Sequence, residues 1–89
     1  MGKVKTQADA EQTANELLEK YGYISIAGPP AHKGQVLGNV RLSSTGGYFQ
    51  HPLVVTGESS LEEFNQQRRH LGMPLWSDPD DHFFRVVAE

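Results

Sequence analysis

Four side chains that could bind a metal ion lie close together near the C-terminus. Asp78, Asp80, Asp81 and His82 fall within five positions, separated only by Pro79. Carboxylate oxygens and imidazole nitrogens are common ligands of divalent cations. The segment lacks the glycine and the distal glutamate of a calcium-binding loop, and aspartate and proline also favour plain turns. We therefore expect a turn before a strand, with no metal ion.

Four histidines, His32, His51, His70 and His82, are spread along the chain. No two of them have the i, i+4 spacing at which a helix presents two zinc ligands, and the chain has no cysteine to complete a zinc site. Sequence spacing does not decide whether His32, His51 and His82 meet in the folded chain. A small-molecule binder or enzyme with a histidine-containing site is therefore one alternative interpretation.

The serines and glycines match neither a hydrolase nor a phosphate-binding pattern. The segment from Gly57 to Ser60 differs from the Gly-x-Ser-x-Gly turn of hydrolases. Gly46 and Gly47 join two predicted strands, whereas a phosphate-binding glycine loop opens a helix. We expect a protein that is not an enzyme, with no catalytic residues and no cofactor.

Basic residues are concentrated only in the segment from Gln66 to His70. Four cations are the candidate contacts for phosphate groups or nucleic acid: Lys33, Arg41, Arg68 and Arg69. The chain has 8 basic and 11 acidic residues, a net charge of −3, which disfavours indiscriminate attraction to phosphate backbones. An RNA- or DNA-binding domain with its basic patch on the second helix is therefore a second alternative.

Two helices are predicted from apolar periodicity and capping residues. Thr6 followed by Asp9 is typical of a helix start, and Gly22 is a natural end. Between them runs an apolar stripe at helical spacing: Ala10, Ala14, Leu17, Leu18 and Tyr21. For the second helix, Ser59 and Ser60 each stand three residues before a glutamate, which is the pattern of a capping box.

Four strands are predicted from β-branched and alternating segments: Tyr23 to Ala27, Gln35 to Leu42, Tyr48 to Thr56 and Phe83 to Ala88. We expect the first three to form an antiparallel meander. The last segment is apolar on both faces except at Arg85, which is typical of a strand covered on both sides. Its neighbours in the sheet, the first or the third strand, are left open.

These elements predict an α+β fold of order α-β-β-β-α-β. The chain would be a two-layer sandwich in which a mainly antiparallel sheet carries both helices on one face. Its 89 residues are expected to form a single domain, 1–89. The α-β-β-β-α order resembles that of double-stranded-RNA-binding domains and of small toxin-like RNA-cleaving proteins, and this resemblance implies RNA binding. The chain departs from that pattern because Glu62 and Glu63, not lysines, open the second helix.

The stretch from Tyr21 to Gly57 has only two formal charges, and apolar residues fall on both faces of its strands. If the helices cover one face, the other face exposes an apolar patch. The residues predicted to form an interface there are Tyr23, Leu37, Tyr48, Val54, Phe83 and Phe84. We expect a non-enzymatic protein-interaction module that pairs through its sheet, face to face or at a strand edge, most simply as a homodimer.

The location expected from composition is the cytoplasm. The chain has no cysteine, so nothing in it requires an oxidising compartment. It contains no apolar run of membrane-spanning length, and its first residues lack the apolar core of a signal peptide. We therefore expect a soluble protein without a membrane partner.

Overall fold

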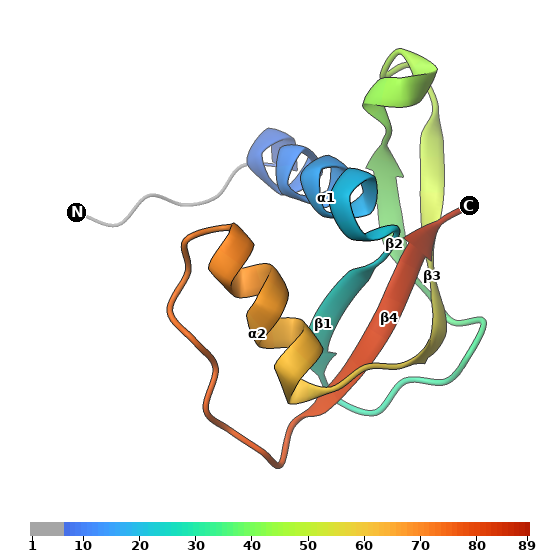
Figure 1. Cartoon of the computed structure of the whole chain (residues 1–89). Coiled ribbons are helices and arrows are strands. Elements are labelled where there is room, and N and C mark those ends of the chain that lie inside the picture. The colour runs from blue at the N-terminus through green and yellow to red at the C-terminus, as the bar shows by residue number, and fades with distance from the viewer. Residues whose placement is uncertain (1–6) are drawn as a thin grey trace.

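The computed structural model describes residues 7 to 89, which form two helices and four strands (Figure 1). In chain order these are α1 (Gln7–Tyr21), β1 (Ile24–Gly28), β2 (Val36–Arg41), the 3-10 turn η1 (Ser43–Thr45), β3 (Gln50–Glu58), α2 (Leu61–His70) and β4 (His82–Ala88). The predicted α+β class and the order α-β-β-β-α-β are confirmed. The helix cap predicted at Thr6 and Asp9 lies outside the residues whose side chains are described.

The four strands form one antiparallel sheet in the order β1-β4-β3-β2. The predicted meander is wrong at one point, because β1 pairs with β4 and not with β2. The last strand lies between the first and the third and pairs with both, which agrees with its apolar residues on both faces. Seven residues that begin with Pro29 and Pro30 connect β1 to β2, enough chain to cross from one edge of the sheet to the other.

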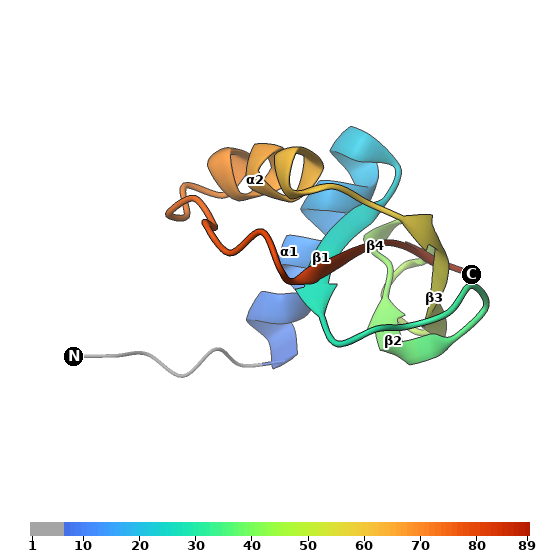
Figure 2. The same ribbon diagram turned by 90° about the horizontal axis from the view of Figure 1, so that it is seen from below.

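The sheet curls around a small apolar core (Figure 2). Val55, Phe84 and Val86 form the centre of this core, and each is at most 6% exposed. From α1, Ala14 and Leu17 are buried as well. The helix contacts both β1 and β2, which are the two edge strands of the sheet. α1 therefore bridges the two edges of the curled sheet.

Two side chains of α1 occupy the free edge of β2 at its C-terminal end. The Glu11 carboxylate accepts a hydrogen bond from the Arg41 N–H at 2.9 Å. The Asn15 amide donates to the Arg41 carbonyl at 2.9 Å and accepts from the Ser43 N–H at 2.8 Å. These side chains take the place of a neighbouring strand, because the backbone groups of an edge strand otherwise have no partner in the sheet.

The other edge of the sheet is closed by a single buried glutamine of α2. The Gln67 side-chain oxygen accepts from the Ser25 N–H at 2.7 Å, and its nitrogen donates to the Tyr23 carbonyl at 3.0 Å. Gln67 is only 2% exposed. α2 packs beside β1 through this amide and through Phe64, whose ring lies 5.4 Å from that of Phe83. α2 thus packs on the side of the sheet that carries Phe83 and Arg85. α1 lies over the opposite side, which carries Ile24 and Val86, so the expected placement of both helices on one face is not found.

The connection from α2 to β4 is fastened to α2 by Trp76. The Trp76 N–H donates to the Asn65 side chain at 2.6 Å, which in turn donates to the Trp76 carbonyl at 3.0 Å. The indole ring meets Phe64 edge-on, with ring centroids 6.0 Å apart. Trp76 thereby holds a long connection in place.

Neither helix within residues 7–89 combines the length and apolar character that crossing a bilayer would require.

Replacing Gln67 by alanine should destabilise the fold. The change leaves one backbone donor and one backbone acceptor of β1 without partners, and a buried unsatisfied group costs on the order of 1 to 3 kcal/mol. We expect Gln67→Ala to lower the free energy of unfolding by about 2 to 4 kcal/mol, measured by urea denaturation. The control is Gln66→Ala, the exposed neighbour in the same helix, for which little change is expected. Equal effects of the two substitutions would contradict this account of the β1 edge.

Candidate functional site

A row of three valines crosses β2, β3 and β4 on the outer face of the sheet. Val36 stands opposite Val54, and Val54 stands opposite Val87. Residues directly opposite each other in paired strands point to the same face, and the next residue along each strand points to the other. Val55 and Val86, the neighbours of Val54 and Val87, are buried in the core. The row therefore lies on the opposite face, where Val36 is 56% exposed and Val54 and Val87 are half-buried.

A polar cluster centred on Glu63 adjoins this row. The Glu63 carboxylate accepts hydrogen bonds from the Ser59 hydroxyl and from the Tyr23 hydroxyl, each at 3.0 Å, and forms a salt bridge with Arg85. The Arg85 guanidinium also lies over the Tyr23 ring, 4.8 Å from its centroid. Arg85 is two residues before Val87 in β4, so it points to the same face as the valine row. The cluster joins α2 to β1 and β4 beside the exposed valines.

The cluster changes the proton affinity of its members in opposite directions. The hydrogen bond from Arg85 is the main reason that the pKa of Glu63 lies below its usual value, and those from Ser59 and Tyr23 act in the same direction. Burial, followed by the hydrogen bond to Glu63, raises the pKa of Tyr23. The bond to Glu63 raises the pKa of Arg85 as well. A carboxylate that already accepts hydrogen bonds from three donors is poorly suited to act as a general base. We therefore interpret the cluster as structural.

Two residues of the predicted interface lie near the valine row. Val54 is its middle member. Tyr23 directly precedes β1 and shares the outer face with Ser25 and Arg85, as its contact with the Arg85 guanidinium shows. Sequence reasoning missed Val36 and Val87, because their alignment with Val54 depends on strand pairing that one sequence does not reveal.

The structure places the other predicted interface residues away from the row. Leu37 lines a cavity under α1 together with core residues, so it faces the opposite side from Val36. Tyr48 precedes β3 at the hairpin end and is 86% exposed. Phe83 and Phe84 are 8% and 6% exposed, so neither presents a free surface in this fold. The expectation that these phenylalanines belong to an exposed patch is wrong, because Phe64 of α2 packs on Phe83 and Phe84 belongs to the core.

The four candidate phosphate contacts lie on three separate parts of the fold. Lys33 belongs to the β1–β2 connection and Arg41 to the opposite end of β2, whereas Arg68 and Arg69 belong to α2. Arg68 donates to the Pro74 carbonyl at 2.6 Å. Its guanidinium also lies 5.5 Å from the ring centroid of Trp76, a contact that helps to hold the α2–β4 connection. Arg69 is exposed. These cations do not form one basic patch.

The histidines and the acidic turn make local contacts. His51 contacts the Thr45 hydroxyl at 3.2 Å and the Glu89 carbonyl at 3.0 Å, near the end of β4. His82 opens β4 at the opposite end of the sheet, so it does not meet His51. In the acidic turn, Asp81 accepts from the Trp76 indole at 2.9 Å. Within the described residues, no three histidine, aspartate or glutamate side chains gather where a metal ion could be held.

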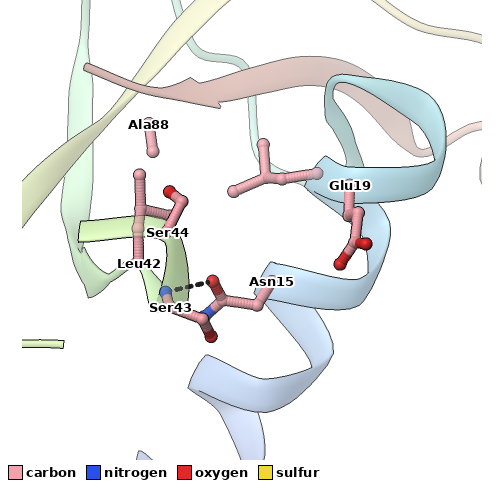
Figure 3. Close-up of a pocket in the computed structure, with 7 residues that line it drawn as sticks. Asn15, Glu19, Leu42, Ser43, Ser44 and Ala88 are labelled. Carbon is pink, nitrogen blue, oxygen red and sulfur yellow. Dashed lines mark hydrogen bonds between the residues drawn. The ribbon is translucent and has the colours of Figure 1, made fainter. Parts of the chain in front are cut away.

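A hollow in the surface lies between α1 and the β2–β3 connection (Figure 3). It has a volume of about 640 Å³ and is lined by Asn15, Leu18, Glu19, Leu42, Ser43, Ser44 and Ala88. Figure 3 shows the Asn15 side chain reaching the Ser43 N–H at its rim. Leucine and alanine walls with a polar rim suit a small ligand in general, but the two serines and Glu19 do not select one chemical class. Its walls come from three distant segments, so no sequence motif pointed to it.

Comparison with known proteins adds no family to this picture. No protein-family model matches the chain, and no curated protein or solved structure matches it.

Glu63 should stabilise the fold in a pH-dependent manner. Its folded-state pKa lies below the usual value of 4.5, so its contribution is present above that value and is lost as the pH falls through the folded-state pKa. We expect Glu63→Gln to lower the urea midpoint at pH 7, with the difference from the parent shrinking as the pH falls below 4.5. Glu62→Gln, a change of the exposed neighbouring acid, serves as control. A difference that stayed the same as the pH fell below 4.5 would show that the charge of Glu63 is not what stabilises the fold.

Proposed function

We propose that this chain is a non-enzymatic interaction module that pairs with a second copy of itself, face to face, through the outer surface of β2, β3 and β4. The observation that carries the proposal is the aligned row of Val36, Val54 and Val87, which stays at the surface. A cytoplasmic location, expected from composition, is part of the proposal.

The closed edges of the sheet support pairing by faces over pairing by strand addition. Gln67 occupies the β1 edge, and Glu11 and Asn15 occupy the C-terminal part of the β2 edge. The remaining part of β2 carries a bulge between Val36 and Gly38. Bulges and covering elements are devices by which proteins prevent edge strands from pairing with another chain. On the outer face, residues 7–89 leave Val36 56% exposed and Val54 and Val87 half-buried.

The chemistry of the row supports a second copy as the partner. The three valines carry no charge, so they favour a surface that is also apolar. A two-fold axis through the row would bring the same residues of another copy against it, which is the usual geometry of homodimers. Tyr23 and the half-exposed Arg85 would stand at the rim, where polar groups are common in interfaces.

The small size of the row sets the expected strength of pairing. Stable interfaces bury roughly 800 Å² on each partner, and three valines with one tyrosine supply only part of such an area. Apolar burial contributes about 25 cal/mol per Å², from which the entropy of association is subtracted. We therefore expect a dimer that forms and dissociates with concentration.

The molar mass in solution, measured by light scattering across a dilution series, tests this proposal. The parent chain should approach twice 9.9 kDa at high concentration and one chain on dilution. Val36→Asp places a carboxylate in the row and should weaken pairing at least tenfold, about 1.4 kcal/mol, with far-ultraviolet circular dichroism unchanged. Leu75→Asp is the matched control, because Leu75 is a similarly exposed apolar residue on the α2–β4 connection.

Three outcomes would contradict the proposal. The first is a mass of one chain at every concentration. The second is a dimer that Val36→Asp leaves intact but Tyr48→Asp dissociates, which would move the interface to the hairpin end. The third is binding of duplex RNA that weakens steeply with salt and on Arg69→Ala, which would favour nucleic-acid binding instead.

A further inference from the structure

A separate, apolar cavity lies between α1 and the concave side of the sheet. Its volume is about 310 Å³. Eight residues line it: Thr13, Ala14, Leu17, Ile24, Ile26, Leu37, Leu53 and Val86. None of them carries a charge, and threonine is the only one with a polar side chain. This wall differs from that of the larger hollow in Figure 3, which has serines, an asparagine and a glutamate at its rim.

The cavity persists because α1 is held over the sheet from two sides. Glu11 and Asn15 tie the helix to β2 by hydrogen bonds, and its buried face also contacts β1. Thr13 and Ala14 are the α1 residues above the gap, and both side chains are short. The hydrogen bonds to β2 restrain the helix from moving inward to compensate for short side chains. Among residues 11–89, no side chain fills the space under Thr13 and Ala14.

The lining of the cavity determines what can occupy it. A buried water molecule usually needs two to four polar partners, and side chains here offer only the Thr13 hydroxyl. An apolar solute instead leaves water and gains dispersion contacts with the walls. An enclosed cavity of about 150 Å³ is large enough for benzene. This one has a volume of about 310 Å³ and is partly open to solvent, so a ligand of that size fits with one side exposed. Size and polarity thus both favour a small hydrocarbon.

We propose that this cavity binds a small, uncharged, hydrocarbon-like molecule of about one or two aromatic rings or a comparable acyl chain. Leu37 forms the mouth, because it lines the cavity and is 40% exposed. It lies at the bulge of β2, which turns it toward the concave side while Val36 faces outward. Exposed side chains change rotamer within nanoseconds, so Leu37 can admit a ligand without unfolding. The cavity and the valine row lie on opposite faces, so this inference does not rest on the proposed pairing.

Titration of the full chain with toluene, followed by methyl NMR, tests the inference. Saturable shifts of the Leu17, Leu53 and Val86 methyls are expected, with nuclear Overhauser contacts between these methyls and the toluene ring. Ala14→Leu should fill the cavity and weaken toluene binding at least about tenfold. Gln12→Leu is the matched control, since it adds the same side chain at an exposed position of α1 and should bind like the parent.

Several results would overturn the inference. One is a set of shifts that grow linearly without saturating, and another is equal toluene binding by the parent and Ala14→Leu. If Ala14→Leu does not fold, the contacts between toluene and the cavity methyls of the parent decide alone. Val36→Asp should bind toluene as the parent does, so failure of pairing and failure of ligand binding are distinguishable. Toluene binding that appeared only in dilute, monomeric samples would show that a second copy fills the cavity instead.

Discussion

The pairing of side chains with part of each sheet edge is the constraint on which this fold depends. A four-stranded sheet that does not close into a barrel leaves two strands with unpaired backbone groups. Here Gln67 pairs with the backbone of β1, and Asn15 with Glu11 pairs with that of β2. Each helix is thereby fixed by hydrogen bonds to one edge, in addition to its apolar contacts. The two helices complete the sheet as neighbouring strands would.

The position of α1 explains both hollows beside it. A helix that packs only by apolar contact can settle toward a sheet until its side chains fill the space. α1 is also held by directional bonds to Arg41 and Ser43 at the edge of β2, which fix its height and its angle. The apolar cavity lies under its short residues, Thr13 and Ala14, and the polar hollow lies beside the Asn15 contact. The bonds that protect the edge thus lie beside both spaces and restrain α1 from closing them.

Local elements could be predicted from this sequence, whereas their pairing could not. Apolar periodicity identified both helices, the cap at Ser60 marked the start of α2, and alternating or β-branched segments identified all four strands. These signals come from residues close in the chain. The prediction of a meander was wrong because strand pairing is decided by long-range contacts. The apolar residues on both faces of β4 nevertheless indicated a central strand. Gln67 follows Phe64 by three positions, on the buried side of α2, and that spacing was the available signal for its role. The valine row had no such signal, because its members come from three strands.

The outer face combines a polar cluster, in which the Glu63 carboxylate already has three hydrogen-bond donors, with the valine row, which has no charged partner to satisfy. This combination limits which contacts a partner could make there. All three donors that reach Glu63 come from its own chain, so a partner could claim that carboxylate only by displacing Ser59, Tyr23 or Arg85. Such a displacement would loosen α2 from β1 and β4. Binding of a partner through the Glu63 carboxylate would therefore cost additional free energy. The valines offer a partner apolar area without breaking any hydrogen bond. In the proposed pairing, selectivity at this face would come from the shape of the row and from the exposed part of Arg85 beside it.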